Sequence, residues 1–367
     1  LSMTATEPSL VRDLETISLL ESGLEHDLET CIRCRDGETY PEPLPPVSEE
    51  MYFEEAARVR YTIDQSALSR RLRAEDEFVE YETAAARIVE ATLPNESTLA
   101  ICNTIESSRL LTNAISEHAQ VSHLGPLIED ALRSREIDAT ADTADSSTIV
   151  ADVLERVSID DEPDEGTAGN PDEMLVLTLN SRYRPFDRQI LIELADHLST
   201  SAVPFILVST QAVEAGVDLS FRTVFRDIAP IDSIVQAAGR SNRSYQWGRN
   251  GGRVIVWMLA PTSEDISEPP AHYVYERGSA DSGIHNHLGL IADVLVEVPD
   301  PADAPDVAVS RDAVDRYFDE LERKSYATSE IRDHVDSAQA RWLSQQSLIG
   351  DYETVDVLVA VTDVEVD

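Results

Sequence analysis

The chain reads F-I-L-V-S-T-Q-A-V-E-A-G-V-D over residues 205–218 and Q-A-A-G-R-S-N-R over residues 236–243. The first stretch starts as a continuous apolar run and then turns polar, which predicts a buried strand that feeds a loop. The second stretch favours a helix, whose offsets of three, four and seven would bring a glutamine, a glycine and two arginines to one face. Those residues are Gln236, Gly239, Arg240 and Arg243.

The side chains of these two stretches suit a nucleoside triphosphate. Two guanidinium groups aimed at one place match the charge that develops on a transferring phosphoryl group. Gln236 can read a base or a phosphate by hydrogen bonds, and Gly239 lets a ligand approach the helix closely. Gly216 gives the first loop backbone freedom, and Asp218 offers a carboxylate to a ribose hydroxyl or to Arg240. The alternatives are a core helix that happens to carry two arginines, and an Asp218 that only caps a turn.

The pattern around these stretches predicts an α/β fold. Short apolar runs at 98–102, 174–178, 205–208 and 253–259 are separated by helical patterns, of which the clearest cover 107–118 and 185–198. Such runs are typical of a parallel sheet that is covered by helices on both faces. Ligands bind such sheets at the carboxyl ends of the strands, where the motif loops fall here.

The composition describes an acidic chain with a packed core. Of its 367 residues 42% are hydrophobic, and the formal net charge is −41. Lys324 is the single lysine, a skew that resembles the proteins of salt-loving archaea; an ordinary acidic protein is the alternative. In molar salt the Debye length is about 3 Å, so this charge would not repel DNA at a distance. No apolar run approaches the ~18 residues of a membrane span, so we expect a cytoplasmic protein with no membrane contact.

Positive charge is concentrated in one window. Between residues 182 and 253 there are nine arginines and seven acidic residues, which gives a local charge of 9 − 7 = +2. Because the whole chain has a formal net charge of −41, we expect a polyanion to bind within this less acidic window.

The two motifs resemble motifs V and VI of superfamily 2 nucleic-acid helicases. Their fuller wording, S-T-Q-A-V-E-A-G-V-D-L-S-F and F-R-D-I-A-P-I-D-S-I-V-Q-A-A-G-R-S-N-R, is similar to the CRISPR-associated helicase–nuclease of type I systems. Residues 1–8 also resemble motif III, which closes the first core domain. The resemblance implies the end of a first RecA-like domain and an interdomain passage over 1–95. It implies a second RecA-like domain over 96–262, and a linker with a small α+β accessory domain over 263–367.

The resemblance also implies roles for particular residues. Arg240 and Arg243 would act as arginine fingers, while Gln236 and Asp218 would sense the nucleotide. ATP with Mg²⁺ would be bound mainly by the first core domain. Single-stranded DNA would contact Asn103 and Thr104, a pair that resembles motif IV. It would also contact the start of motif V and the sequence N-S-R-Y-R-P-F-D-R over residues 180–188, called here the S-R-x-R stretch. For Thr104 a helix N-cap is the alternative. These candidate DNA contacts are Asn103, Thr104, Arg182, Arg188, Ser209, Thr210 and Gln211.

Several patterns that the chemistry of ATP or of a metal would need are missing from this sequence. A phosphate-cradling loop requires G-K-[ST], and Lys324 has no glycine nearby. The D-E-x-D string at 161–164 lies in a proline-containing charge run rather than at the end of a buried strand. Cys31 and Cys34 form one C-x-x-C pair, whereas a structural zinc needs a second pair, so we predict no metal site; a mixed site with the nearby His26 is the alternative. The chain alone should therefore neither hydrolyse ATP nor unwind DNA.

The sequence thus predicts the C-terminal half of an ATP-dependent DNA helicase of CRISPR defence. Its expected partners are single-stranded DNA, the first RecA-like domain with the nuclease half, and the CRISPR surveillance complex. One alternative is a split-gene subunit or inactive remnant that only binds nucleic acid or a partner. Another is a different superfamily 2 helicase that acts on RNA or in repair.

Overall fold

The computed structural model describes residues 56–68, 78–135, 145–157, 173–213, 218–263, 265–276 and 287–323. Several expectations lie outside these ranges: the motif III-like segment 1–8, the Cys31–Cys34 pair, the D-E-x-D string at 161–164 and Gly216. Within the described part, no helix is long and apolar enough to cross a membrane.

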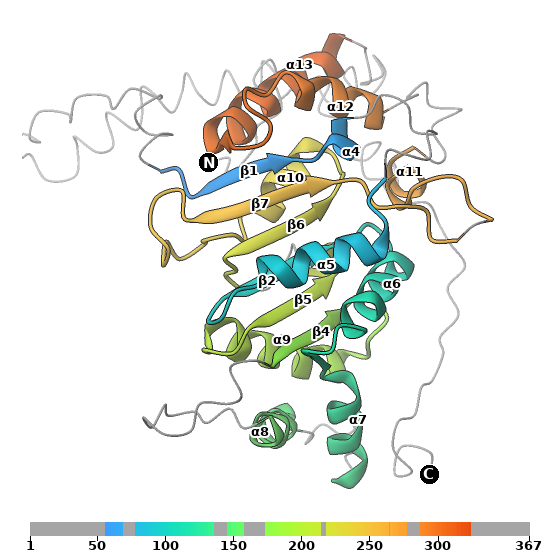
Figure 1. Ribbon diagram of the computed structural model, residues 1–367, viewed down its shortest axis with the longest axis vertical. Coiled ribbons are helices and arrows are strands. Elements are labelled where there is room, and N and C mark those ends of the chain that lie inside the picture. The colour runs from blue at the N-terminus through green and yellow to red at the C-terminus, as the bar shows by residue number, and fades with distance from the viewer. Residues whose placement is uncertain are drawn as a thin grey trace, which may run out of the picture.

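The described residues form one eight-stranded sheet with the order β3-β4-β5-β2-β6-β7-β1-β8 (Figure 1). All neighbouring strands pair in parallel except the short edge strand β8, which runs antiparallel to β1. The predicted class, a parallel sheet with helices, is confirmed. The strands are β1 (Val59–Ile63), β2 (Ser97–Ile101), β3 (Val121–His123), β4 (Met174–Leu179), β5 (Phe205–Ser209), β6 (Thr223–Asp227), β7 (Gly252–Trp257) and β8 (Ala304–Pro305).

Helices cover both faces of this sheet. Helices α5 and α6 lie on the front face in Figure 1, and α9 and α10 lie behind the strands. The helices are α4 (Gln65–Leu68), α5 (Tyr81–Ala91), α6 (Ile105–Ser116), α7 (Gly125–Ser134), α8 (Ser146–Arg156), α9 (Pro185–Thr200), α10 (Ile231–Ala238), α11 (Pro270–Tyr275), α12 (His287–Val296) and α13 (Val314–Arg323), with a 3₁₀ turn at Gln211–Val213 and a π-helical segment at Ala308–Ala313.

The two faces hold two separate hydrophobic clusters, because side chains alternate along each strand. On β2, Leu99 and Ile101 belong to the larger cluster with α9, α10 and α12, whereas Ala100 joins the cluster beneath α5 and α6. Every residue of β2, β4, β5 and β6 is buried. Burial on both faces explains why these strands read as continuous apolar runs in the sequence.

The predicted domain boundaries at 95 and 263 do not separate the sheet. Strand β1 lies inside the segment expected to be an interdomain passage, yet it pairs with β7 over its whole length. Strand β8 follows residue 263 and pairs with the other edge of β1. Helices α12 and α13 pack into the same core as the strands. The core domain therefore includes residues from all three predicted segments, because sheet pairing joins strands that are distant in sequence.

Candidate functional site

Strands β2, β5 and β6 are neighbours at the centre of the sheet, and their carboxyl ends carry many of the predicted site residues. Asn103 and Thr104 follow β2, and Thr210 and Gln211 follow β5. Because β2 pairs in parallel with both β5 and β6, these strand ends lie at one edge. The structure therefore brings the motif IV-like pair and the start of motif V together, as expected for a site at the carboxyl edge of an α/β sheet.

Asn103 is buried at this edge and uses every hydrogen-bonding group of its side chain. Its Nδ2 donates to Asp227 Oδ2 and to the carbonyl of Ile228, both at 2.8 Å. Its Oδ1 accepts from Arg226 Nη1 at 2.8 Å and from the Tyr275 hydroxyl at 3.2 Å. An amide has two donors and two acceptor positions, and all four are satisfied here. The prediction that this side chain contacts DNA is therefore wrong for this arrangement.

Sequence reasoning gave no role to the charged residues around Asn103. Arg226 and Asp227 end β6, and both are 0% exposed. Burial raises the pKa of the Asp227 carboxyl to about 7, although the N–H of Leu259 and the nearby Arg226 favour its charged form. We call Asn103, Arg226, Asp227 and Tyr275 the carboxyl-edge node. Its signal in the sequence is a pair of charged residues at the end of the apolar run T-V-F-R-D-I-A-P over residues 223–230.

Thr104 begins helix α6. Its hydroxyl accepts from the N–H of Ser107 at 3.1 Å, and the Ser107 hydroxyl accepts from the N–H of Thr104 at 3.2 Å. This reciprocal capping box confirms the alternative that Thr104 is the helix N-cap. Thr104 is partly exposed, so its contact with DNA stays a prediction.

The start of motif V divides into buried and accessible residues. Ser209 is fully buried, and its hydroxyl donates to the carbonyl of Leu179 at 2.7 Å, so the expected contact of this side chain with DNA is wrong. Thr210 is also buried. Gln211 is partly exposed, and its Nε2 lies 3.4 Å from the carbonyl of Asn103 and 3.4 Å from the Tyr275 hydroxyl. Gln211 is thus the accessible side chain of the Ser209–Gln211 segment.

The motif VI stretch is not one continuous helix. Helix α10 ends at Ala238, Gly239 is its C-cap, and the chain continues in tight turns to Asn242, which has a φ of +48°. The predicted single helical face for this motif is therefore wrong. The Asn242 side chain holds the turn, since its Nδ2 donates to the carbonyls of Arg58 at 2.9 Å and Gly248 at 2.7 Å.

The two motif VI arginines end up in different environments. Arg240 is buried, with 7% of its surface exposed. The Arg243 side chain is 42% exposed, and its Nε lies 2.5 Å from Oδ1 of Asp218, whose side chain is 84% exposed. The main-chain N–H of Arg243 also donates to the Ser220 hydroxyl at 3.1 Å. Motifs V and VI thus meet through Arg243, whereas the sequence had suggested Arg240 as the partner of Asp218. Gln236 is exposed on the last turn of α10.

The S-R-x-R stretch lies after β4 at the same carboxyl edge. Arg182 is exposed, and its N–H donates to Oδ1 of the buried Asn180 at 3.0 Å. Arg188 is partly exposed, and its Nη2 donates to the carbonyl of Ser181 at 3.2 Å. Both arginines remain candidates for phosphate contacts.

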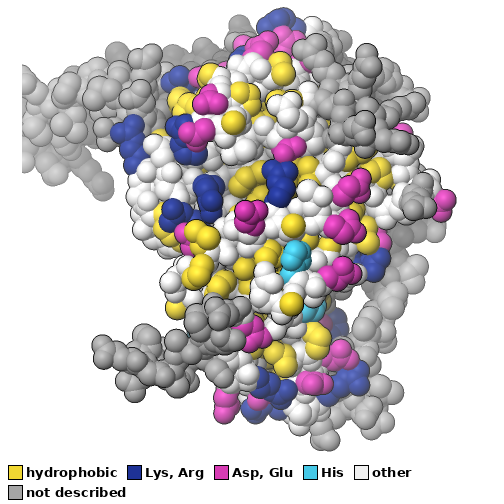
Figure 2. Space-filling view, in the orientation of Figure 1, with side chains coloured by type: hydrophobic (Ala, Val, Ile, Leu, Met, Phe, Trp, Pro, Cys, Tyr) yellow, Lys and Arg dark blue, Asp and Glu magenta, His cyan; other side chains and the backbone are white. Residues whose placement is uncertain are grey.

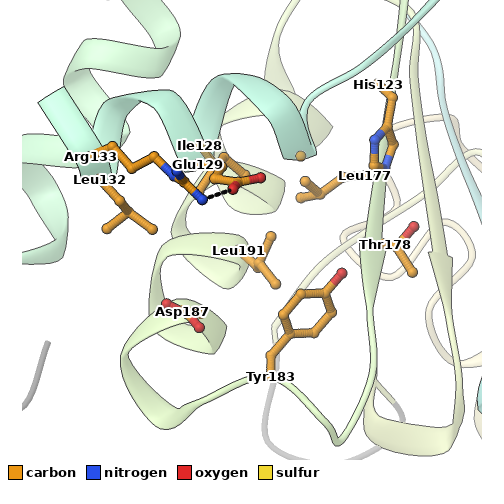
Figure 3. A pocket seen from close by; sticks show the side chains of 11 residues that line it. His123, Ile128, Glu129, Leu132, Arg133, Leu177, Thr178, Tyr183, Asp187 and Leu191 are labelled. Carbon is orange, nitrogen blue, oxygen red and sulfur yellow. Dashed lines mark hydrogen bonds and ion pairs between the residues drawn. The ribbon is translucent and has the colours of Figure 1, made fainter. Parts of the chain in front are cut away.

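A cavity of about 370 Å³ opens beside this stretch, between α7, β4 and α9 (Figure 3). The Tyr183 ring and Leu191 line it together with Leu177 from β4 and Ile128 from α7. His123 stands at the rim, and burial lowers its pKa. None of the predicted site residues lines this cavity, whose lining mixes apolar residues with charged ones such as Glu129, Arg133 and Asp187.

The arginines of the positive window do not form one surface. Arg226 and Arg240 are buried. Arg222 and Arg253 lie where β6 and β7 begin, and both stand 3.6 Å from the carboxylate of Glu96. Figure 2 shows basic side chains gathered at the left, where the strands of Figure 1 begin, and acidic ones at the right over the helices. Part of the positive charge is thus at the amino edge of the sheet, away from the predicted DNA contacts.

The described residues contain no cluster of three or more His, Cys, Asp or Glu side chains that could hold a metal ion.

Comparisons with known proteins agree with the motifs. The family model described as CRISPR-associated nuclease/helicase Cas3, C-terminal, matches residues 94–246. The CRISPR-associated nuclease/helicase Cas3 of Haloferax volcanii is 53% identical over 372 residues, which cover 100% of this chain and 40% of that protein. This chain therefore spans less than half the length of the curated relative it matches.

Solved structures also align with this chain, at lower identity. A crystal structure of T. fusca Cas3 with ADP aligns with a TM-score of 0.44 and 13% identity, covering 84% of this chain and 28% of the other. A CRISPR RNA-guided surveillance complex in a pre-nicking state contains a chain that aligns with a TM-score of 0.31 and 17% identity, covering 71% of this chain and 29% of the other. The present chain is homologous to a C-terminal portion of the CRISPR-associated nuclease/helicase Cas3.

Proposed function

We propose that this chain supplies the second RecA-like core domain of an ATP-dependent DNA helicase that acts in type I CRISPR defence. The main support for the proposal is an ion pair that joins the two motifs. Oδ1 of Asp218 in motif V lies 2.5 Å from Nε of Arg243 in motif VI, and both side chains are exposed. A helicase of this class needs a mobile guanidinium at an interdomain cleft, because charge develops on the phosphoryl group only during hydrolysis. The 53% identity to a Cas3 protein supports the same reading.

Within this proposal the two arginines have different tasks. Arg243 is the arginine finger, because its exposed side chain can leave Asp218 and reach a nucleotide that the first core domain presents. Arg240 is buried in the turn that precedes Arg243, and its main-chain groups bond to Ala237 and Phe221. Gln236 and Asp218 are both exposed, and they sense the nucleotide. ATP with Mg²⁺ is bound mostly by the first core domain, since this chain contains no G-K-[ST] loop.

Single-stranded DNA is proposed to cross the carboxyl edge of the sheet. Thr104, Arg182, Arg188 and Gln211 are the accessible candidates there. Each arginine would neutralise a phosphate, so its loss should weaken binding equally for all DNA sequences and reduce the salt slope by about one. Closure and opening of the cleft would then move this edge along the strand, and a CRISPR surveillance complex would deliver the DNA.

A chimera tests the proposal directly. In it this chain replaces the matching 40% of the Haloferax volcanii protein, which supplies the first core domain and the nuclease. We expect ATP hydrolysis that single-stranded DNA stimulates, and none from this chain alone. Hydrolysis by the isolated chain at a helicase-like rate would contradict the proposal. A folded chimera that binds DNA but never hydrolyses ATP would favour a binding module instead.

A further inference from the structure

Tyr275 ends helix α11, and no motif drew attention to it. Its hydroxyl reaches the carboxyl edge of the sheet and meets three side chains there. It lies 3.2 Å from Asn103 Oδ1, 3.3 Å from Arg226 Nη2 and 3.4 Å from Gln211 Nε2. One oxygen atom of α11 therefore touches the ends of β2 and β6 and the segment that follows β5.

The chemical groups themselves determine which atom donates and which accepts in these contacts. A guanidinium group and an amide NH₂ group only donate, so the Tyr275 oxygen accepts from both Arg226 and Gln211. Its single proton is then donated to Oδ1 of Asn103. A phenol hydroxyl offers one donor and two acceptor positions, and all of them are used. Phenylalanine would fill the same space but could make none of these contacts.

The position of Gln211 depends on this arrangement. Its Nε2 contacts the Tyr275 hydroxyl and the carbonyl of Asn103, each at 3.4 Å. Both contacts use the amide nitrogen, and they therefore restrict the rotation of the amide group. Asn103 itself is fixed by Arg226 and Asp227, which are fully buried. Tyr275 is thus the partly exposed member of the carboxyl-edge node, a group of hydrogen-bonded side chains whose other members are buried.

We propose that Tyr275 is a positioning residue for DNA binding, and that it acts by holding Gln211 at the carboxyl edge of the sheet. This inference rests on the proposed function. It assigns to α11, which follows the last parallel strand, a task in DNA contact that neither the motifs nor the family comparison gives it.

The test uses the chimera with Tyr275→Phe. We expect the concentration of single-stranded DNA for half-maximal stimulation of ATP hydrolysis to rise about fivefold, because a few weak hydrogen bonds are lost. The rate at saturating DNA should stay within about twofold, since no group near the nucleotide changes. Tyr273→Phe is the matched control, because it removes a hydroxyl from the same helix and should leave both values unchanged.

A double substitution shows whether Tyr275 acts through Gln211. Gln211→Ala should raise the DNA requirement by itself, and adding Tyr275→Phe should raise it no further. Additive increases in the DNA requirement of the double variant would overturn the inference. An unchanged DNA requirement in Tyr275→Phe would also overturn it, and so would a joint fall in the melting temperature and in the rate at saturating DNA. If the unsubstituted chimera shows no DNA-stimulated hydrolysis, both proposals fail. If DNA stimulates hydrolysis by the unsubstituted chimera and Tyr275→Phe leaves the DNA requirement unchanged, only the inference about Tyr275 fails.

Discussion

The carboxyl-edge node and the Arg243–Asp218 pair both join charged side chains, but they lie in opposite environments. In the node, Arg226 and Asp227 are fully buried and Asn103 satisfies groups of both. In the pair, two exposed side chains meet at 2.5 Å. Breaking a buried charge arrangement is strongly destabilising, whereas an exposed ion pair contributes about 0–1 kcal/mol. The node can therefore serve as a fixed base beneath the edge where we propose that DNA binds, while the pair can open as the proposed catalytic cycle requires.

The largest expected effect concerns activity at the exposed pair. Arg243→Ala in the chimera should lower ATP hydrolysis by about 10³-fold, because an arginine finger is worth roughly 10³–10⁵ in rate. The free energy of unfolding should change by less than about 1 kcal/mol. Steady-state ATPase assays and urea unfolding measure the two quantities. Arg249→Ala, another exposed arginine six residues further on, is the control and should leave the rate unchanged.

The next effect concerns stability at the buried node. Asn103→Leu removes the amide between Arg226 and Asp227, and we expect the free energy of unfolding to fall by about 3 kcal/mol because buried charged groups lose their partners. Urea unfolding measures the loss. Asn113→Leu changes an exposed asparagine on α6 and should cost far less. Equal losses in the two variants would show that the node is not a stabilising base.

A smaller effect is the pH dependence that Asp227 adds. Its folded-state pKa is about 7, above the ordinary value of 3.8, so between these values the folded protein binds more protons than the unfolded chain. The contribution of Asp227 to stability is therefore present at low pH and is lost as the pH rises toward 7. Relative to Asp227→Asn, wild-type stability should decline by at most about 1.4 kcal/mol per pH unit between pH 4 and 7. A difference that does not vary with pH would contradict this.

The smallest effect is expected for Asp218→Asn. This carboxylate is 84% exposed, so its ion pair with Arg243 adds little to stability. We expect the melting temperature to move by less than about 2 °C, as measured by circular dichroism. A larger drop in melting temperature would show that the Arg243–Asp218 pair stabilises the fold as the carboxyl-edge node does, which would contradict the difference drawn between them.

The sequence predicted the central strands well because burial on both faces leaves a direct mark. The expected strands at 98–102, 174–178 and 205–208 match β2, β4 and β5 to within one residue at each end. The same reasoning missed β1, since its residues alternate between buried and partly exposed and its neighbour β7 is about 190 residues away. Sheet membership of this kind depends on long-range pairing, which local patterns do not contain.

The sequence predicted which strand ends carry the candidate residues, but it did not predict their side-chain contacts. The motifs predicted that Asn103 and Gln211 lie at the carboxyl ends of neighbouring strands, and the structure places both there. They suggested Arg240 as the partner of Asp218, whereas the structure pairs Asp218 with Arg243. The periodic pattern could not show that α10 ends at Ala238, because the turn is held by Asn242 bonding to the carbonyl of Arg58, 184 residues earlier. Nor could it show that Asn103 faces inward, since that orientation depends on Arg226 and on Tyr275 from a later helix.

Chemical rescue by free guanidinium tests most directly which arginine reaches the nucleotide. Arg240→Ala and Arg243→Ala would each be measured in the chimera for DNA-stimulated ATP hydrolysis, with guanidinium chloride added at millimolar concentrations below those that unfold the protein. Because the space left by Arg243 is open to solvent, we predict that guanidinium restores hydrolysis at least tenfold in Arg243→Ala and has no effect on Arg240→Ala. Rescue confined to Arg240→Ala would contradict the assignment of Arg243 as the finger.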